Sequence, residues 1–364
     1  MSKFVMKIIV LLFIFQITLS ASEKLIFASV LFRHGDRTPT KALLNKKNAH
    51  NWKLGLGELT PEGMHQEYKL GEYLNDRYIK HFTLIPENYN SNKIYVRATD
   101  VNRTLMSAES LLYGFYPLGT GPLINNKTAL PYRFQPVPIH SALTLNDKLL
   151  SSRMIYTHEV HKLQKKLVYN SKAWLNMQTG CQNYFKNWAV ISGFKIDNLK
   201  DVKFLASNIF IREKHGIKQP KGLTNTGKDT LLKLASWIHA EQYKPQAIGM
   251  LISKDLIKQI IDTAKKSIKD KSACKLFLYS AHDTNILGLM SALGVPLDKN
   301  PHYASFMAIE LYEINKKYFI KLIYNKKEVK LHLSNTDGYY PFNTFANYCN
   351  KVVQNVSPRR TIDN

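Results

Sequence analysis

A continuous apolar run near the start of the chain ends abruptly in charged residues, in the stretch LIFASVLFRHGDRTPT at residues 25–40. The run Leu25–Phe32 shows little alternation, which is typical of a strand buried on both faces in a parallel sheet flanked by helices. The charged segment RHGDR follows at once, and Pro39 prevents the strand from continuing. In open α/β sheets, ligands bind at the carboxyl ends of the strands. The stretch therefore predicts an α/β fold with a binding site at the end of this strand.

The same order of strand, charged turn and helix recurs at residues 93–113. The short run Lys93–Val96 is interrupted by the segment RATD, and a helical pattern follows over Val101–Tyr113. Thr99 or Asp100 is the expected N-cap of that helix.

A third unit has the same order. The apolar run Leu276–Ala281 ends at the segment HDT, and a helix is expected over Ile286–Leu293, stopped by Gly294 and Pro296. Because parallel strands place their carboxyl ends on one edge of the sheet, we expect the charged side chains of the three units to meet there. The expected group consists of Arg33, His34, Arg37, Arg97, His282 and Asp283.

This group of side chains suits the chemistry of a phosphate dianion. Guanidinium groups bind phosphate oxygens in a bidentate manner, and Gly35 lets the backbone approach the anion. Neighbouring positive charge keeps an imidazole such as His34 neutral and therefore nucleophilic. Asp283 is the natural proton donor to a departing alkoxide. The arginines should lower its pKa and a bound dianion should raise it again, so we expect an acid working pH; no metal or other cofactor is required.

The N-terminus has the pattern of a secretory signal. Lys3 and Lys7 precede the apolar run Ile8–Leu19, which is shorter than the roughly 20 residues that span a membrane. Small residues precede Ala21, so we expect a signal peptide at residues 1–20 and an exported protein, either periplasmic or secreted. An uncleaved anchor is the alternative. No second apolar stretch of spanning length follows.

Charge and cysteine content narrow the choice of partners. The formal net charge of +24 favours anionic partners, but no dense basic segment is interleaved with aromatic residues, so nucleic acid is not an expected partner. None of the three cysteines has the arginine six residues later that a cysteine phosphatase requires, and their pairing is left open. His158 and His161 lack the zinc-protease spacing, so no metal site is expected.

Several motifs together resemble the histidine acid phosphatases, in the branch of the prostatic and lysosomal enzymes. The quoted matches are RHGDRTP at 33–39, LTPEG at 59–63, YVRATDVNRT at 95–104 and YSAHDT at 279–284. A bacterial member is expected. The resemblance implies that His34 is the phosphorylated nucleophile and Asp283 the proton donor. It also implies that Arg33, Arg37, Arg97 and His282 are phosphate ligands.

The resemblance implies a mostly parallel central sheet flanked by helices, like that of the phosphoglycerate mutases, with an inserted helical cap. We expect the core at 21–137 and 230–350, the cap at 138–229 with helical patterns at Lys162–Leu175 and Asp229–Ala240, and a tail at 351–364. Expected substrates are small phosphomonoesters; phosphoproteins, phospholipids and a homodimer are left open. The alternatives are a phytase of the same family and a phosphate- or lipid-binding protein without turnover.

Overall fold

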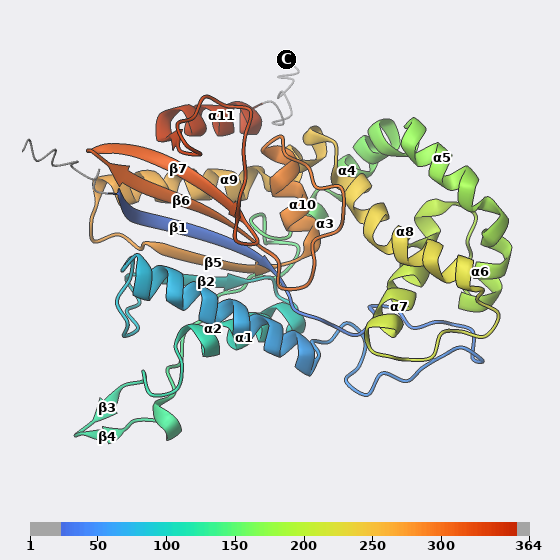
Figure 1. The fold of residues 1–364 in the computed structure, drawn as a ribbon, viewed down its shortest axis with the longest axis horizontal. Coiled ribbons are helices and arrows are strands. Elements are labelled where there is room, and N and C mark those ends of the chain that lie inside the picture. The colour runs from blue at the N-terminus through green and yellow to red at the C-terminus, as the bar shows by residue number, and fades with distance from the viewer. Residues whose placement is uncertain (1–22, 355–364) are drawn as a thin grey trace, which may run out of the picture.

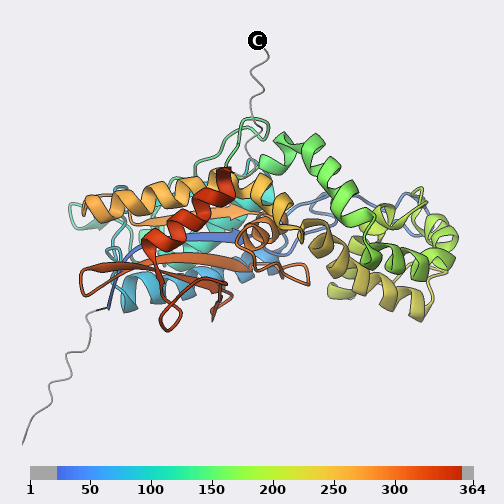
Figure 2. The ribbon, with the colours of Figure 1, turned by 90° about the horizontal axis from the view of Figure 1, so that it is seen from above.

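The structure is a computed structural model that describes residues 23–354. The predicted signal peptide at 1–20 lies outside these residues. So does most of the tail predicted at 351–364, but residues 351–354 belong to the last helix of the described chain. The chain forms a seven-stranded sheet with helices on both faces, and a group of further helices extends beyond one end of it (Figure 1). Seen from above, these two parts lie side by side along the long axis of the molecule (Figure 2).

The three predicted strands are parallel neighbours in the sheet. They are β2 (Ile94–Ala98), β5 (Leu276–Ala281) and β1 (Glu23–Arg33), in that order. Arg33 pairs with Ala281, and Ala98 pairs with Ser280, so the three strands end at the same level. Nine residues of β1 are buried without alternation, as expected for a strand covered on both faces.

Antiparallel strands complete the sheet on the far side of β1. Their order is β6, β7 and β8, with β9 also paired to β7. The bounds are β6 (Phe306–Ile314), β7 (Lys317–Tyr324), β8 (Lys327–Glu328) and β9 (Tyr340–Pro341). The predicted site residues thus follow the strands of the parallel part of the sheet. The predicted α/β class is confirmed.

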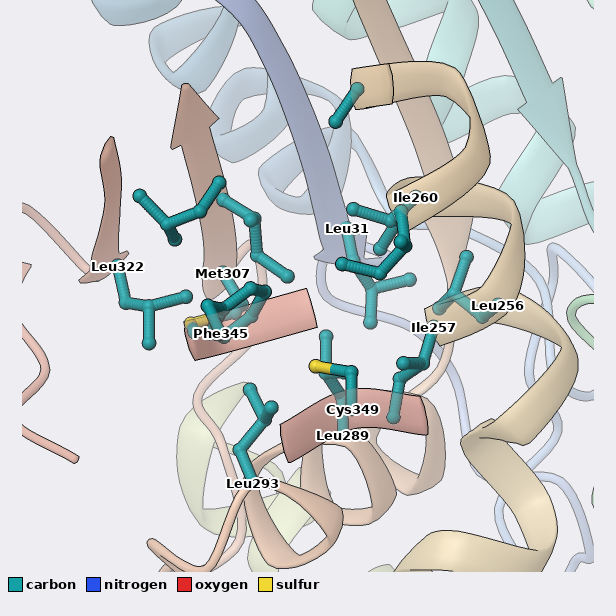
Figure 3. Close-up of a cluster of buried hydrophobic side chains, with 14 of the residues drawn as sticks. Leu31, Leu256, Ile257, Ile260, Leu289, Leu293, Met307, Leu322, Phe345 and Cys349 are labelled. Atoms are coloured by element: carbon teal, nitrogen blue, oxygen red, sulfur yellow. The ribbon is translucent and has the colours of Figure 1, made fainter. Parts of the chain in front are cut away.

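Two hydrophobic clusters hold helices against the two faces of the sheet. On one face lie α9 (Gln246–Lys269), α10 (Asp283–Ala292) and α11 (Phe342–Gln354). Figure 3 shows part of this cluster, where Leu31 of β1 lies near Ile257 of α9 and Leu289 of α10. On the other face lie α1 (Pro61–Asn75) and α2 (Asn102–Phe115).

The helices beside the sheet differ in how their N-termini are capped. Thr60 caps α1, where its side chain accepts a hydrogen bond from the backbone of Gly63, and Pro61 is the first helical residue, a position that proline favours. For α2 the prediction is wrong: the N-cap is Val101, without a side-chain cap, rather than Thr99 or Asp100. After α2 the chain forms a small hairpin of β3 (Leu123–Ile124) and β4 (Lys127–Thr128).

The separate helical part has its own hydrophobic cluster, which includes Trp174 and Trp188. Its helices are α3 (Ser152–Ile155), α4 (Thr157–Gln164), α5 (Lys172–Cys181), α6 (Phe185–Ser192), α7 (Lys203–Lys214) and α8 (Asn225–Tyr243). The helix expected over 162–175 is divided, because Ser171 accepts a hydrogen bond from the backbone of Trp174 and starts a new helix there. The domain limits, with the cap at 138–229, stay a prediction. Within residues 23–354, no helix combines the length and hydropathy needed to cross a membrane.

Candidate active site

The loop after β1 stays close to the end of β5. The backbone amide of His34 donates to the carbonyl of Ala281 at 3.0 Å, and that of Gly35 donates to Oγ of Ser107 at 3.1 Å. A Cβ atom at Gly35 would lie 2.3 Å from the carbonyl oxygen of Gly63, so this position has room only for glycine. The sequence RHG therefore packs against the start of α1 with the His34 ring in a fixed place.

The His34 ring is buried and is held in one orientation. Its Nδ1 atom lies 2.8 Å from the carbonyl oxygen of Gly35 and donates to it, which leaves the lone pair on Nε2. Burial lowers the pKa of His34 well below its ordinary value, and the charges of Arg103, Arg33, His282 and Arg37 lower it further. The ring is therefore a neutral imidazole, the form that can act as a nucleophile.

His282 stands beside His34, as predicted. The two ring centroids are 5.5 Å apart and nearly perpendicular. Nε2 of His282 lies 3.0 Å from Oγ1 of Thr99, which follows β2, so His282 joins residues from the ends of all three strands. Burial, followed by the charge of Arg103, lowers the pKa of His282 to about 3. His282 is thus also neutral in the free protein.

A cavity of about 370 Å³ opens next to this histidine pair. Arg33, Arg37 and Asp283 line it, and the aromatic ring of Tyr303 covers the guanidinium of Arg33 at 4.3 Å. The His34 ring centroid is 5.9 Å from that of Tyr303, which lies on the cavity wall. The cavity therefore has cationic groups and an apolar ring at the end nearest His34, an arrangement suited to an anion with an organic substituent.

Asp283 is surrounded by donors. Its Oδ2 atom lies 3.1 Å from Nη2 of Arg33 and 3.1 Å from Nδ2 of Asn300, and its Oδ1 atom accepts a hydrogen bond from the amide of Thr284 at 2.8 Å. Burial alone would raise the pKa of Asp283, but Arg33 and His239, together with Asn300, hold it well below its ordinary value. The carboxyl group is therefore ionised in this state.

The structure does not bring Arg97 to this group, and the prediction for its position is wrong. Its guanidinium forms an ion pair with Asp147 at 2.8 Å, and it is not on the cavity wall. The reason is strand alternation: Ile94 and Val96 face the cluster beside α2, so Arg97 faces the other side of β2, as Tyr95 does.

Arg103, in the first turn of α2, takes the position expected for Arg97. Its Nη2 atom lies 3.5 Å from Nδ1 of His282, and it is the strongest charge acting on both His34 and His282. Burial, followed by the charge of Arg37, lowers the pKa of Arg103 itself to about 10. Arg103 lies in the motif NRT shortly after the end of β2, and this position could have identified it from the sequence. Which of the two arginines reaches the site depends on the direction of their side chains on β2 and α2.

Other cavity residues carry no motif that could have revealed them. Lys203 and Lys214 come from α7, His239 comes from α8, and Asn300 and Tyr303 come from the loop before β6. The segments that contribute them carry no recognisable catalytic motif, so only the fold shows that they line the same cavity as Asp283. Among residues 23–354, no three His, Cys, Asp or Glu side chains gather as a set of metal ligands.

Known proteins share this fold over nearly its whole length. A phytase from Klebsiella sp. ASR1 superimposes with a TM-score of 0.68 at 15% sequence identity, covering 92% of this chain and 98% of that one. A phytase from Hafnia alvei, in complex with tartrate, superimposes with a TM-score of 0.67 at 17% identity, covering 91% and 97% of the two chains. At these identities the likeness concerns the fold.

Sequence comparison gives the family. A lysosomal acid phosphatase from Xenopus laevis is 32% identical over 329 residues, which cover 88% of this chain and 74% of the relative. A prostatic acid phosphatase from Homo sapiens is 30% identical over 318 residues, which cover 84% and 78%. The model of the histidine phosphatase superfamily (branch 2) matches residues 24–184 and 134–325. With the buried histidine pair among arginines at the strand ends, these matches show that the chain belongs to branch 2 of the histidine phosphatase superfamily.

Proposed function

We propose that the chain hydrolyses phosphate monoesters at acid pH through a covalent phosphohistidine on His34. The observation that carries this proposal is the orientation of His34, whose Nδ1 donates to the carbonyl of Gly35 and whose Nε2 keeps its lone pair among arginines. Nε2 attacks phosphorus as the bond to the leaving oxygen breaks, and water then cleaves the nitrogen–phosphorus bond. Arg33, Arg37, Arg103 and His282 bind the phosphoryl oxygens.

Asp283 protonates the leaving oxygen in the first step. Its contact with Arg33 keeps it ionised in the free protein, but a bound phosphate dianion competes for the same guanidinium. Loss of that contact, together with the negative charge of the substrate, raises the pKa of the carboxyl group toward the acid working range. In the second step the resulting carboxylate accepts a proton from the attacking water.

A hydrolysis assay tests this function. We expect turnover of p-nitrophenyl phosphate at about pH 5 in the presence of EDTA, since a general acid works best near its own pKa. His34→Ala should abolish turnover, while His158→Ala, which removes an exposed histidine of α4, should leave it unchanged. Phosphate binding without turnover in the unmodified protein would instead support a phosphate- or lipid-binding protein. The presence of Asp283 argues against a binding protein, because binding alone needs no proton donor.

A phytase is the second candidate, and two lysines favour it. Lys203 and Lys214 line the cavity beyond the arginines, so the cavity has more positive charge than one phosphate group needs. A substrate with several phosphate groups would use this charge. If it does, Lys203→Ala and Lys214→Ala should raise KM for phytate more than for glycerol phosphate. A panel that adds a phosphopeptide and a lysophospholipid tests the protein and lipid substrates.

We propose export to a periplasm or to the medium, on the basis of the signal pattern at 1–20. Mass spectrometry of the N-terminus of the exported protein should find Ala21 or a neighbouring residue, and retention of Met1 would contradict cleavage. Periplasmic export presumes a bacterial source.

We also propose a homodimer formed around the β3–β4 hairpin. Leu123, Ile124 and Tyr132 are 49%, 62% and 80% exposed, and Leu130 lies between them in the chain. Neighbouring apolar side chains that face solvent often mark a contact with a partner. Sedimentation velocity should find a dimer that Ile124→Glu dissociates; a monomer at all concentrations would contradict it.

A further inference from the structure

A second imidazole lies beside Asp283 and has no part in the function proposed above. His239 is on α8 and lines the same cavity as Arg33 and Asp283. Its Nδ1 atom is 3.6 Å from Oδ2 of Asp283, an ion-pair distance when the imidazole is protonated. The two side chains are only 18% and 12% exposed, so water screens this contact poorly.

Among the residues that the structure describes, His239 has no polar contact other than the one with Asp283. Both of its ring nitrogens are buried and lack a hydrogen-bond partner. The charged groups that face it are Asp283 from α10, Lys203 from α7 and Arg33 from β1. A buried polar group without a partner is costly and calls for an explanation. The two cations repel an imidazolium, so the only group that attracts the ring in its charged form is Asp283.

Asp283 must be protonated before it can act as a proton donor, but its surroundings favour the ionised form. Oδ2 of Asp283 faces Arg33 and Asn300 in addition to His239, and this arrangement stabilises the carboxylate. Departure of an alkoxide requires a protonated carboxyl group. Arg33 does not release its proton, and the amide of Asn300 donates a hydrogen bond but is not acidic enough to release a proton. Among these three neighbours, only the imidazole of His239 can take up a proton from solution and release it again.

We propose that His239 supplies the proton that Asp283 passes to the leaving group and receives it back in the second step. This inference rests on the phosphatase function proposed above. When phosphate draws Arg33 away, the proton on Nδ1 of His239 moves to Oδ2 of Asp283, and the Nδ1–H bond is replaced by an O–H bond. Asp283 then protonates the leaving oxygen as its bond to phosphorus breaks. In the second step, the proton from water returns through Asp283 to Nδ1. His239 is thus a positioning residue that acts through Asp283.

The acid working pH follows from the same arrangement. Burial lowers the pKa of His239, and Lys203 and Arg33 lower it further, against the opposing effect of Asp283. The imidazolium therefore forms only in acid solution, and the proton supply ends as the pH rises. A buried imidazole with a low pKa beside a carboxylate is suited to donate a proton quickly and to recover it.

Two substrates separate this role from a structural one. The p-nitrophenolate ion leaves without a proton, whereas the alkoxide of glycerol 2-phosphate needs one. The test variants are His239→Asn, whose amide nitrogen replaces Nδ1 as a donor but cannot titrate, and His239→Ala. The matched control is His158→Asn, at an exposed histidine of α4. For each protein, kcat/KM is measured for both substrates from acid to neutral pH.

We expect His239→Asn to lose at least about 100-fold in kcat/KM for glycerol 2-phosphate, the lower end of what proton transfer contributes, and much less for p-nitrophenyl phosphate. For the alkyl substrate, the pH at which activity declines should also move to a lower value. An equal loss of kcat/KM for both substrates would overturn the role of His239. So would an unchanged kcat/KM with the same pH profile as the control variant. Absence of turnover in the unmodified protein would instead overturn the function on which it rests.

Discussion

Asp36 and His215 meet across the junction between the sheet and the helical part, where Oδ2 of Asp36 lies 2.7 Å from Nε2 of His215. Asp36 belongs to the loop that carries His34 and is completely buried. The same Oδ2 atom accepts a hydrogen bond from Oγ1 of Thr60, the N-cap of α1, at 2.6 Å. One carboxylate thus fixes the loop of His34 to the start of α1 and to the end of α7.

Removal of this link should affect both stability and substrate binding. His215→Ala removes one partner of the Asp36 carboxylate, and we expect a loss of about 1.5–3 kcal/mol in the free energy of unfolding, the usual contribution of a hydrogen bond to a charged group. Because α7 carries Lys203 and Lys214, KM should rise more than kcat falls. Urea unfolding and steady-state kinetics measure the two effects, with His65→Ala on the exposed face of α1 as control. An unchanged midpoint and KM would contradict this link.

The ion pair between Arg77 and Glu310 should be a large single contribution to stability. Two nitrogens of Arg77 lie 2.6 Å from the two carboxylate oxygens of Glu310, and Tyr78 and Tyr312 donate to the same group at 2.8 and 2.7 Å. Glu310 is completely buried. Arg77→Ala leaves that charge without its counter-ion, so we expect a loss of about 3–5 kcal/mol in the free energy of unfolding.

A neighbouring pair provides the control for this prediction. Lys80 and Asp76 form an ion pair at 2.7 Å in the same turn of the chain, but both side chains are largely exposed. Water and salt screen such a pair, so Lys80→Ala should scarcely move the unfolding midpoint. Chemical denaturation of both variants gives the comparison. Similar midpoints for Arg77→Ala and Lys80→Ala would show that burial does not decide the strength of the Arg77 pair.

The sequence predicted the parallel part of the fold because local signals and tertiary packing agree there. The strand Leu276–Ala281 has the predicted bounds, and α1 begins at Pro61 after Thr60, with proline and threonine at the positions they favour at a helix start. In many different folds, a short buried apolar run forms a strand, and a proline after a threonine starts a helix. The convergence of His34, His282 and Asp283 followed from the parallel order of the strands.

The sequence could not predict features that depend on side-chain direction or on distant contacts. Arg97 and Arg103 lie in one motif, and only the pleat of β2 and the first turn of α2 decide that Arg103 faces His282. The antiparallel strands beyond β1 depend on pairing over long sequence separations. His239 reaches Asp283 only because α8 packs against α10, and no motif marks that contact.

The two arginines of this motif should give opposite results on substitution. Arg103→Ala removes the guanidinium nearest to His282 and the strongest charge on His34, so kcat/KM should fall by at least about 100-fold, as for other groups that stabilise transferring charge. Arg97→Ala breaks only the ion pair with Asp147, so the melting temperature should fall while kcat/KM changes little. A large loss of kcat/KM in Arg97→Ala, with activity kept in Arg103→Ala, would restore the original assignment.

Glu67 is an unusual group in the first part of the chain. It lies on α1 and is completely buried, and within residues 23–354 neither of its carboxylate oxygens has a hydrogen-bond partner. Burial raises its pKa well above the ordinary value of 4.5. The folded protein therefore keeps this carboxyl group protonated at a pH at which the unfolded chain has already released the proton.

This difference makes the folded state more stable in acid. Between the unfolded pKa and the raised folded pKa, unfolding releases a proton, so the free energy of unfolding falls by roughly 1 kcal/mol for each pH unit above about pH 4.5. Glu67→Gln keeps the shape of the side chain but does not titrate, so it should remove this slope. The free energy of unfolding of the variant should therefore increase relative to that of the unmodified protein as the pH rises. Urea unfolding across the acid to neutral range measures it, with the exposed Glu62→Gln as control. Equal slopes in all three proteins would mean that Glu67 is ionised in the folded state.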